Sequence, residues 1–136
     1  MFWADLGSWG KTERADLTGE NRVTLRYFYY RWSPISAIIE FKSERIYWMD
    51  RHTLFYTDRD GYSRKYLRRY IRENINPVDL ALYEDNLYWV DTNSRSIHWF
   101  NKTHPGQMLS FGHLTNGILV GAVVSDESRQ PASKLI

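Results

Sequence analysis

The chain has 136 residues, enough for one domain with a substantial core, and its 16% aromatic content excludes an intrinsically disordered chain. It has no cysteine, which excludes a disulfide framework, a cysteine zinc site and a thiol nucleophile. The 18 basic and 16 acidic residues leave a net charge of +2, too small to indicate a polyanionic partner, and no apolar run approaches the roughly 20 residues of a membrane span.

The first predicted element is a strand at residues 2–5, where an aromatic residue, a tryptophan, any residue and an aspartate follow one another. Residues 38–41, 45–49 and 54–57 are short, rich in β-branched and aromatic side chains, and bounded by turn-forming residues, so we predict a strand at each. Residues 66–75 have the best helical spacing in the chain, and we expect one or two helical turns there at most.

The last part of the chain repeats the same order, with strands predicted at residues 79–83, 87–90, 96–100 and 118–124. The motif of an aromatic residue, tryptophan, any residue and aspartate thus occurs three times. Its anchors are Phe2, Trp3 and Asp5, then Tyr47, Trp48 and Asp50, then Tyr88, Trp89 and Asp91. After each copy come a second acidic or amide residue and a glycine, namely Asp16 and Gly19, Asp58 and Gly61, and Asn101 and Gly106. The copies begin 45 and 41 residues apart. A repeat of about this length with about four strands is typical of a β-propeller.

The aromatic pairs in the motifs predict how the sheets pack. Successive residues of a strand point to opposite faces of its sheet, so Tyr47 and Trp48, like Tyr88 and Trp89, place large rings on both faces. Both faces then need a covering layer, which predicts sheets stacked face to face around an axis. The aspartate that ends each motif is expected to accept hydrogen bonds from backbone N–H groups of the adjoining turn, which is a structural role.

These three motifs resemble the YWTD repeats, or class B repeats, of the low-density lipoprotein receptor and its relatives. FWADLGSWGKTERADLTGENRVTL resembles one repeat, and PVDLALYEDNLYWVDTNSRSIHWFNK resembles the last repeat of such a propeller. The threonine of the motif is replaced by Ala4, Met49 and Val90, and the middle copy diverges most. The resemblance implies an all-β fold, a partial six-bladed YWTD-type β-propeller of about three blades, each a four-stranded antiparallel sheet.

The resemblance also implies a domain organisation. Residues 1–131 would form the C-terminal half of the propeller, with repeats at about 1–33, 34–76 and 77–124 and a tail at 132–136. The full-length protein would be a single-pass membrane receptor with this part extracellular, completed by further blades and an EGF-like module, although the chain itself has no signal or transmembrane segment. We expect no membrane contact within these residues. Because half a ring leaves blade faces uncovered, we expect the isolated chain to aggregate or to need a partner.

For function, the resemblance implies a non-enzymatic propeller that binds protein ligands in endocytosis or signalling, without a cofactor or a metal. One alternative is a six-bladed propeller hydrolase with an axial metal, near which Asp79 and Asn116 would lie. Another is a truncated product without independent activity. The sequence contains neither GxSxG nor HExxH, and its histidines lack metal-ligand spacing.

Three further features are candidates for function. The basic stretch at residues 64–72 interleaves cations with aromatic residues, but the adjacent Glu73 and the low net charge favour a solvated outer strand, so we expect no nucleic-acid partner. Asn101 begins an N-glycosylation sequon. Four histidines could titrate in an acid-dependent release of ligand: His52, His98, His104 and His113.

Overall fold

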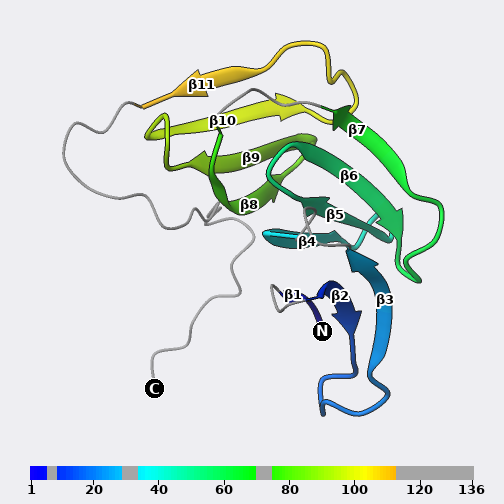
Figure 1. Ribbon diagram of the computed structural model, residues 1–136. Coiled ribbons are helices and arrows are strands. Elements are labelled where there is room, and N and C mark those ends of the chain that lie inside the picture. The colour runs from blue at the N-terminus through cyan, green and yellow to red at the C-terminus, as the bar shows by residue number, and fades with distance from the viewer. Residues whose placement is uncertain (6–8, 29–33, 70–74, 113–136) are drawn as a thin grey trace, which may run out of the picture.

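The structure is a computed structural model that describes residues 1–5, 9–28, 34–69 and 75–112 (Figure 1). These residues form eleven strands and no helix, so no helix in the described ranges could cross a membrane. The strands are β1 (Phe2–Asp5), β2 (Gly10–Arg14), β3 (Val23–Phe28), β4 (Ser36–Glu40), β5 (Arg45–Met49), β6 (Thr53–Asp58), β7 (Lys65–Arg69), β8 (Pro77–Tyr83), β9 (Asn86–Asp91), β10 (Ser96–Asn101) and β11 (Leu109–Phe111).

The strands pair into three antiparallel sheets, and every pair joins strands that are consecutive in the chain. The first sheet contains β1, β2 and β3, the second β4 to β7, and the third β8 to β11. Figure 1 shows the three sheets following one another from the blue N-terminal strands to the yellow and orange ones. The strand predictions at 38–41, 45–49, 54–57, 79–83, 87–90 and 96–100 are confirmed by β4, β5, β6, β8, β9 and β10.

Two hydrophobic clusters lie on opposite faces of the second sheet, as the aromatic pairs predict. One cluster contains Trp48 and Phe55 of the second sheet with Phe28 of the first. The other contains Tyr47 of the second sheet with Trp89 of the third. Both rings of the second motif are about 1% exposed, so the second sheet is covered on both faces. The sheets are therefore stacked face to face.

The expected helical turns at residues 66–75 are wrong where the structure describes them. Residues 65–69 form strand β7, in which Tyr66 pairs with Phe55 and Arg68 with Leu54 of β6. Pairing with β6 overrides the local helical spacing, because strand and helix propensities are weak against tertiary structure. Residues 70–74 and the strand predicted at 118–124 lie outside the described residues.

Candidate protein-interaction surface

The repeated motif lies at the C-terminal end of β1, β5 and β9. Its tryptophans occupy equivalent positions in the three strands. Trp48 and Trp89 are almost fully buried, and each points toward the sheet that precedes its own. Trp48 donates its indole N–H to Thr57 Oγ1 at 3.0 Å. Trp3 is only half-buried, and the Arg22 guanidinium lies 5.1 Å from the centre of its ring. The motif aromatics thus act as packing residues where a neighbouring sheet is present.

The motif aspartates Asp50 and Asp91 are buried and accept backbone N–H groups. Asp50 Oδ1 accepts the N–H groups of His52 and Thr53, each at 2.8 Å. Asp91 Oδ1 accepts the N–H groups of Asn76 at 2.8 Å and Asn93 at 3.1 Å. These carboxylates hold the turns that follow or precede their strands.

The two buried aspartates differ in their acidity. Burial raises the pKa of the Asp50 carboxyl, and the N–H groups of His52 and Thr53 offset only part of that rise. Burial also acts on Asp91, but hydrogen bonds from Ser94, Asn76 and Asn93 outweigh it, so the Asp91 pKa is lowered.

The third motif aspartate, Asp5, is more exposed than the other two. Its side chain is 41% exposed, and one oxygen lies 3.9 Å from Lys11 Nζ. Residues 6–8, which follow it in the chain, lie outside the described ranges.

The acidic residue and glycine that follow each motif form equivalent turns in the first two sheets. The Gly19 N–H donates to the Asp16 carbonyl and the Gly61 N–H to the Asp58 carbonyl, at 3.0 and 3.1 Å. Both glycines have a left-handed backbone, with φ of 87° and 83°. A Cβ on Gly61 would lie 2.8 Å from Leu25 Cβ, so this turn also seats the second sheet against the first.

The end of the sheets that carries these turns exposes large apolar side chains. We call this end the turn face; it comprises the loops at 15–22, 41–44, 59–64, 84–85 and 102–108, each of which follows its strand on the same side of the sheets. Leu17 is 88% exposed, Phe41 82% and Tyr62 74%. Exposed aromatic and aliphatic residues grouped with charges are typical of protein-binding surfaces.

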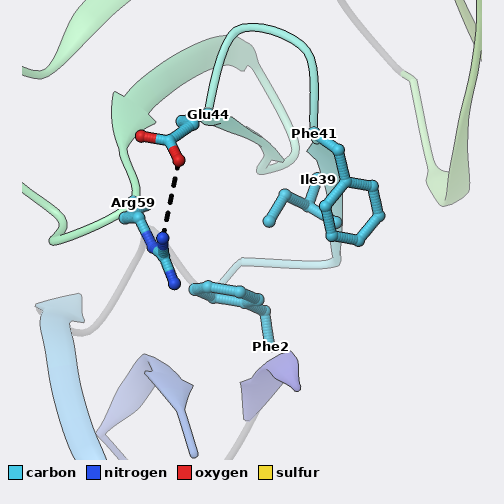
Figure 2. A pocket seen from close by; sticks show the side chains of 5 residues that line it. All are labelled: Phe2, Ile39, Phe41, Glu44 and Arg59. Carbon is cyan, nitrogen blue, oxygen red and sulfur yellow. Dashed lines mark ion pairs between the residues drawn. The ribbon is translucent and has the colours of Figure 1, made fainter.

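A pocket of about 110 Å³ opens on the turn face between the first two sheets. Figure 2 shows Phe2 on one side, Ile39 and Phe41 on another, and the ion pair between Glu44 and Arg59 opposite them. The Arg59 Nη1 and Glu44 Oε1 atoms are 3.5 Å apart, and both side chains are more than half exposed. A pocket with an apolar wall beside two solvent-exposed charges has the chemistry to bind an apolar side chain of another protein, where that side chain is flanked by a polar or charged group.

A second, polar hollow of about 390 Å³ adjoins the pocket and shares Glu44 and Arg59 with it. Arg45 lies 4.6 Å from the Tyr56 ring centre within it, and Asp58, Asp60 and Lys65 contribute further charges. The two hollows together form a continuous mixed surface over the turns of the second sheet.

Lys102 ties the third sheet to the second at the same end. Its Nζ donates to Glu40 Oε1 at 2.6 Å, to the Glu84 carbonyl at 2.9 Å and to Asp85 Oδ1 at 2.9 Å. The hydroxyl of Tyr47 donates to the other oxygen of Glu40 at 3.0 Å. Burial opposes ionisation of Lys102, but its two carboxylate partners outweigh burial and raise its pKa. In the sequence, Lys102 is only the middle residue of the sequon that begins at Asn101, and nothing there predicts this contact.

The residues that the sequence suggested for a metal site or a pH response lie in different parts of the structure. Asp79 Oδ1 accepts the Ser36 hydroxyl at 3.1 Å and the Leu80 N–H at 2.8 Å, while Asn116 and His113 lie outside the described residues. His98 is buried and stacks on Trp89, whereas His52 and His104 are exposed. No group of three or more His, Cys, Asp or Glu residues within the described ranges could hold a metal ion.

Two other predicted features lie on or near the turn face. Asn101 is half-buried at the end of β10, where its Oδ1 accepts the N–H groups of Thr103 and His104. In the basic stretch, the Arg64 guanidinium lies over the rings of Phe55 and Tyr66, at 4.3 and 4.5 Å. Phe55 is fully buried, whereas Tyr66 is 41% exposed.

Comparisons with known proteins agree with this architecture. No family model matches the chain. The chain is 28% identical over 104 residues to the vitellogenin receptor of Solenopsis invicta and 29% identical over 104 residues to the vitellogenin receptor Yl of Drosophila melanogaster. These alignments cover 75% of this chain but only 6% and 5% of the two receptors, so the chain spans a small part of their length. They support the resemblance to the low-density lipoprotein receptor family.

A solved structure supports the fold. A chain in the crystal structure of a nidogen/laminin complex matches with a TM-score of 0.75 and 22% identity, over 90% of this chain and 46% of that chain. The predicted fold class, an all-β part of a YWTD-type propeller, is confirmed.

Proposed function

We propose that this part of a YWTD-type propeller is a non-enzymatic, extracellular module that binds protein ligands for a receptor similar to those of the low-density lipoprotein receptor family. The observation that carries the proposal is the turn face. It combines an apolar pocket, an exposed ion pair at its rim and aromatic side chains that the fold leaves exposed. Such a combination provides anchors and specificity for a protein surface.

The names of the similar proteins support the same class of function. Two of them are receptors for vitellogenin, and the third was crystallised as a nidogen/laminin complex. Uptake of the ligand by endocytosis or transmission of a signal would then be the task of the receptor as a whole. The C-terminal-half assignment and the repeat limits at about 1–33, 34–76 and 77–124 are part of this proposal, as are further blades and an EGF-like module beside it.

A non-enzymatic role agrees with the chemistry of the motif. The carboxylates of Asp50 and Asp91 are engaged by backbone N–H groups, and Asp79 is engaged by Ser36 and Leu80. A propeller hydrolase would instead need carboxylates or amides directed to a metal or a substrate. Metal analysis of the purified protein and a hydrolase substrate screen separate the two hypotheses.

Binding measurements on single-residue variants test the turn face. We expect the chain to bind vitellogenin or a laminin fragment in a surface-immobilised assay, and Phe41→Ala to weaken that binding at least about tenfold, as truncation of an interface anchor does. Phe111→Ala is the matched control, because Phe111 is also an exposed aromatic but lies on β11 of the third sheet. Absence of binding to both proteins, or equal loss in both variants, would contradict the proposal.

The predicted N-glycosylation site at Asn101 has its own test. When the chain is secreted from insect cells behind a signal peptide, we expect a glycosidase-sensitive mass increase that Asn101→Gln abolishes. A secreted chain of unmodified mass would remove Asn101 as a glycosylation site.

A further inference from the structure

We propose that β7 and the polar hollow beside it form a binding site for a sulfated polysaccharide of the cell surface or the extracellular matrix. The class of ligand rests on the extracellular location in the proposed function, whereas the positive charge of the site does not. The inference is carried by the charge of β7, by two cations that have no carboxylate partner in the described ranges, and by the polar lining of the hollow.

The outermost strand of the second sheet lies in a strongly basic segment. Residues 64–69 (RKYLRR) carry four positive charges and no negative one, whereas the whole chain has a net charge of +2. The equivalent outer strands lack this charge, because β3 (VTLRYF) has one cation and β11 (LSF) has none. The sheets therefore form without a basic outer strand, so the charge of β7 indicates an anionic ligand.

Two exposed cations lie on the face of the second sheet that turns toward the third. Arg45 is on β5 and Lys65 on β7, and Tyr56 of the strand between them pairs with Lys65. Tyr56 packs against the cluster that contains Trp89, which identifies this face. The Arg45 guanidinium lies 4.6 Å from the Tyr56 ring centre. Neither cation forms an ion pair with a carboxylate of the described residues.

Two of the three carboxylates that line the hollow are engaged by other cations. Asp60 Oδ1 lies 2.7 Å from Arg14 Nη1 of the first sheet. Glu44 Oε1 lies 3.5 Å from Arg59 Nη1, and Arg59 lines the hollow as well. Each pair is neutral as a whole.

The third carboxylate, Asp58, is engaged by the backbone of its own turn. Its Oδ1 accepts the N–H groups of Asp60 and Tyr62, at 3.2 and 2.8 Å. Arg45 and Lys65 are therefore the charged groups of the hollow that a ligand would pair with, and both are positive. A guanidinium and an ammonium group bind anionic oxygens through charge-assisted hydrogen bonds.

The spacing of the cations suits a chain of anionic groups. The backbones of Arg45 and Lys65 are separated by β6 and so lie roughly 10 Å apart. Lys65 and Arg68 are three residues apart on β7, which is again about 10 Å. Arg68 Nη1 donates to the Pro105 carbonyl at 3.1 Å, so the row of cations extends toward the loop between β10 and β11 (Figure 1). A linear polysaccharide with several sulfates can contact all three cations together.

The lining of the hollow favours a polysaccharide over an acidic protein segment. Of the residues that line it, Tyr56 alone has a largely apolar side chain, and the others are serines and charged residues. Protein ligands are anchored by apolar side chains in well-packed pockets, and this hollow has no apolar wall for one. A volume of about 390 Å³ bounded by hydroxyls and charges suits the hydrated hydroxyl and sulfate groups of a sugar.

Heparin is the probe, and its affinity for the 136-residue chain is measured by surface plasmon resonance at several salt concentrations. We expect the double variant Arg45→Gln and Lys65→Gln to bind heparin at least about tenfold more weakly, with a salt slope smaller by about two. The matched control is Arg51→Gln with Arg95→Gln, which removes the same charge from exposed positions at the opposite end of the sheets. No binding of heparin, or an equal loss in both double variants, would overturn the proposal.

Competitors in solution identify the class of ligand. We expect soluble heparin to displace the chain from immobilised heparin, and polyglutamate or a single-stranded oligonucleotide of equal charge to displace it far less. Equal competition by polyglutamate would assign the site to an acidic protein segment, and equal competition by the oligonucleotide would assign it to nucleic acid. Either result would overturn the proposal.

Two further measurements separate this site from the protein-binding surface and from errors of folding. Phe41→Ala should leave heparin binding unchanged, so heparin binding without any protein ligand would refute only the proposed function, and the reverse would refute only this inference. In the unsubstituted chain, heparin should slow the acetylation of Lys65 more than that of Lys11. An unchanged rate at Lys65 would overturn the proposal even if the double variant failed to fold.

Discussion

Lys102, in the turn after β10 of the third sheet, donates a hydrogen bond of 2.6 Å to Glu40, which is 62 residues earlier in the chain and ends the first strand of the second sheet. Both side chains are largely buried, at 8% and 14% exposed. The contact therefore joins two neighbouring sheets through a charge pair with little access to solvent, and Tyr47 and Asp85 complete its hydrogen bonds.

Removing one partner of this pair should destabilise the chain. We expect Lys102→Met to lower the free energy of unfolding by about 2–3 kcal/mol, because Glu40 would remain buried without its cation. Asp85→Asn is the control, since Asp85 is 61% exposed, and we expect a cost below about 1 kcal/mol. Urea unfolding at pH 7 gives both changes in the free energy of unfolding. Equal changes in the two variants would show that the contact between Lys102 and Glu40 adds nothing to stability.

The same pair should weaken in acid. Burial raises the pKa of Glu40, but hydrogen bonds from Lys102, Ser43 and Tyr47 outweigh it, so the pKa is lowered. A lowered carboxyl pKa stabilises the fold above the unfolded value, near 4.5, and that contribution is lost as the pH falls through the folded value. In a double-mutant cycle of Glu40→Gln and Lys102→Met we expect a coupling of about 1–2 kcal/mol at pH 7 that shrinks at pH 3. A coupling of the same size at both pH values would contradict this assignment.

Glu13 should give the first sheet its own acid sensitivity. The Arg22 guanidinium, helped by Lys11 and opposed by burial, lowers the pKa of Glu13 from 4.5 to about 2. Its contribution to stability is thus complete above pH 4.5 and is lost between pH 4.5 and about 2. Arg22 is 55% exposed, so we expect a contribution of only about 1–2 kcal/mol. Glu13→Gln should remove this share of the acid destabilisation, as measured by urea midpoints at pH 7 and 3; an unchanged pH dependence would refute the prediction.

Gly61 and Gly19 make a matched pair for the turn face. Both have a left-handed backbone, but a Cβ on Gly19 would meet no atom within 4 Å, whereas a Cβ on Gly61 would lie 2.8 Å from Leu25 Cβ and 2.9 Å from its carbonyl oxygen. We expect Gly19→Ala to cost about 1 kcal/mol of stability from backbone strain alone, and Gly61→Ala about 2–4 kcal/mol from strain plus the displacement of β3. Thermal unfolding of the two variants compares them directly, and equal melting temperatures would mean that Gly61 does not seat the two sheets together.

Asp50 and Asp91 hold the same motif position but should respond differently to neutralisation. The Asp50 pKa is raised, so its charge disfavours the fold as the pH rises through the folded value, while the lowered pKa of Asp91 stabilises the fold above its unfolded value, near 3.8. At pH 7 we therefore expect Asp50→Asn to change stability by less than about 1 kcal/mol and Asp91→Asn to cost about 1–3 kcal/mol. Chemical denaturation at pH 7 checks the order, and a larger cost at Asp50 would reverse it.

The strands and the buried tryptophans could be predicted because their signals are local. Alternating aromatic and β-branched residues mark β5, β6 and β9, and the recurrence of Trp48 and Trp89 implies that both faces of a sheet are covered. Local spacing was also the source of the error at residues 66–75, where pairing with β6 decides the conformation of residues 65–69.

The pocket and the Lys102 contact could not be predicted in the same way. The pocket joins Phe2 to Arg59, and the charge pair joins Glu40 to Lys102, so each depends on how two sheets sit against each other. A repeat indicates that sheets stack, but it does not indicate which turn residues meet once they have stacked. For Lys102, the polar context of a sequon gives no sign that the side chain is buried.

The pairing of each strand with its chain neighbour has a consequence for how the polypeptide matures during synthesis. No described sheet contains a strand from a distant part of the chain, so the mean sequence separation of contacts within a sheet is low. Hairpins can therefore form in chain order as the polypeptide leaves the ribosome. Because Trp48 and Trp89 each pack against the preceding sheet, we expect the two tryptophans to become buried in chain order during synthesis.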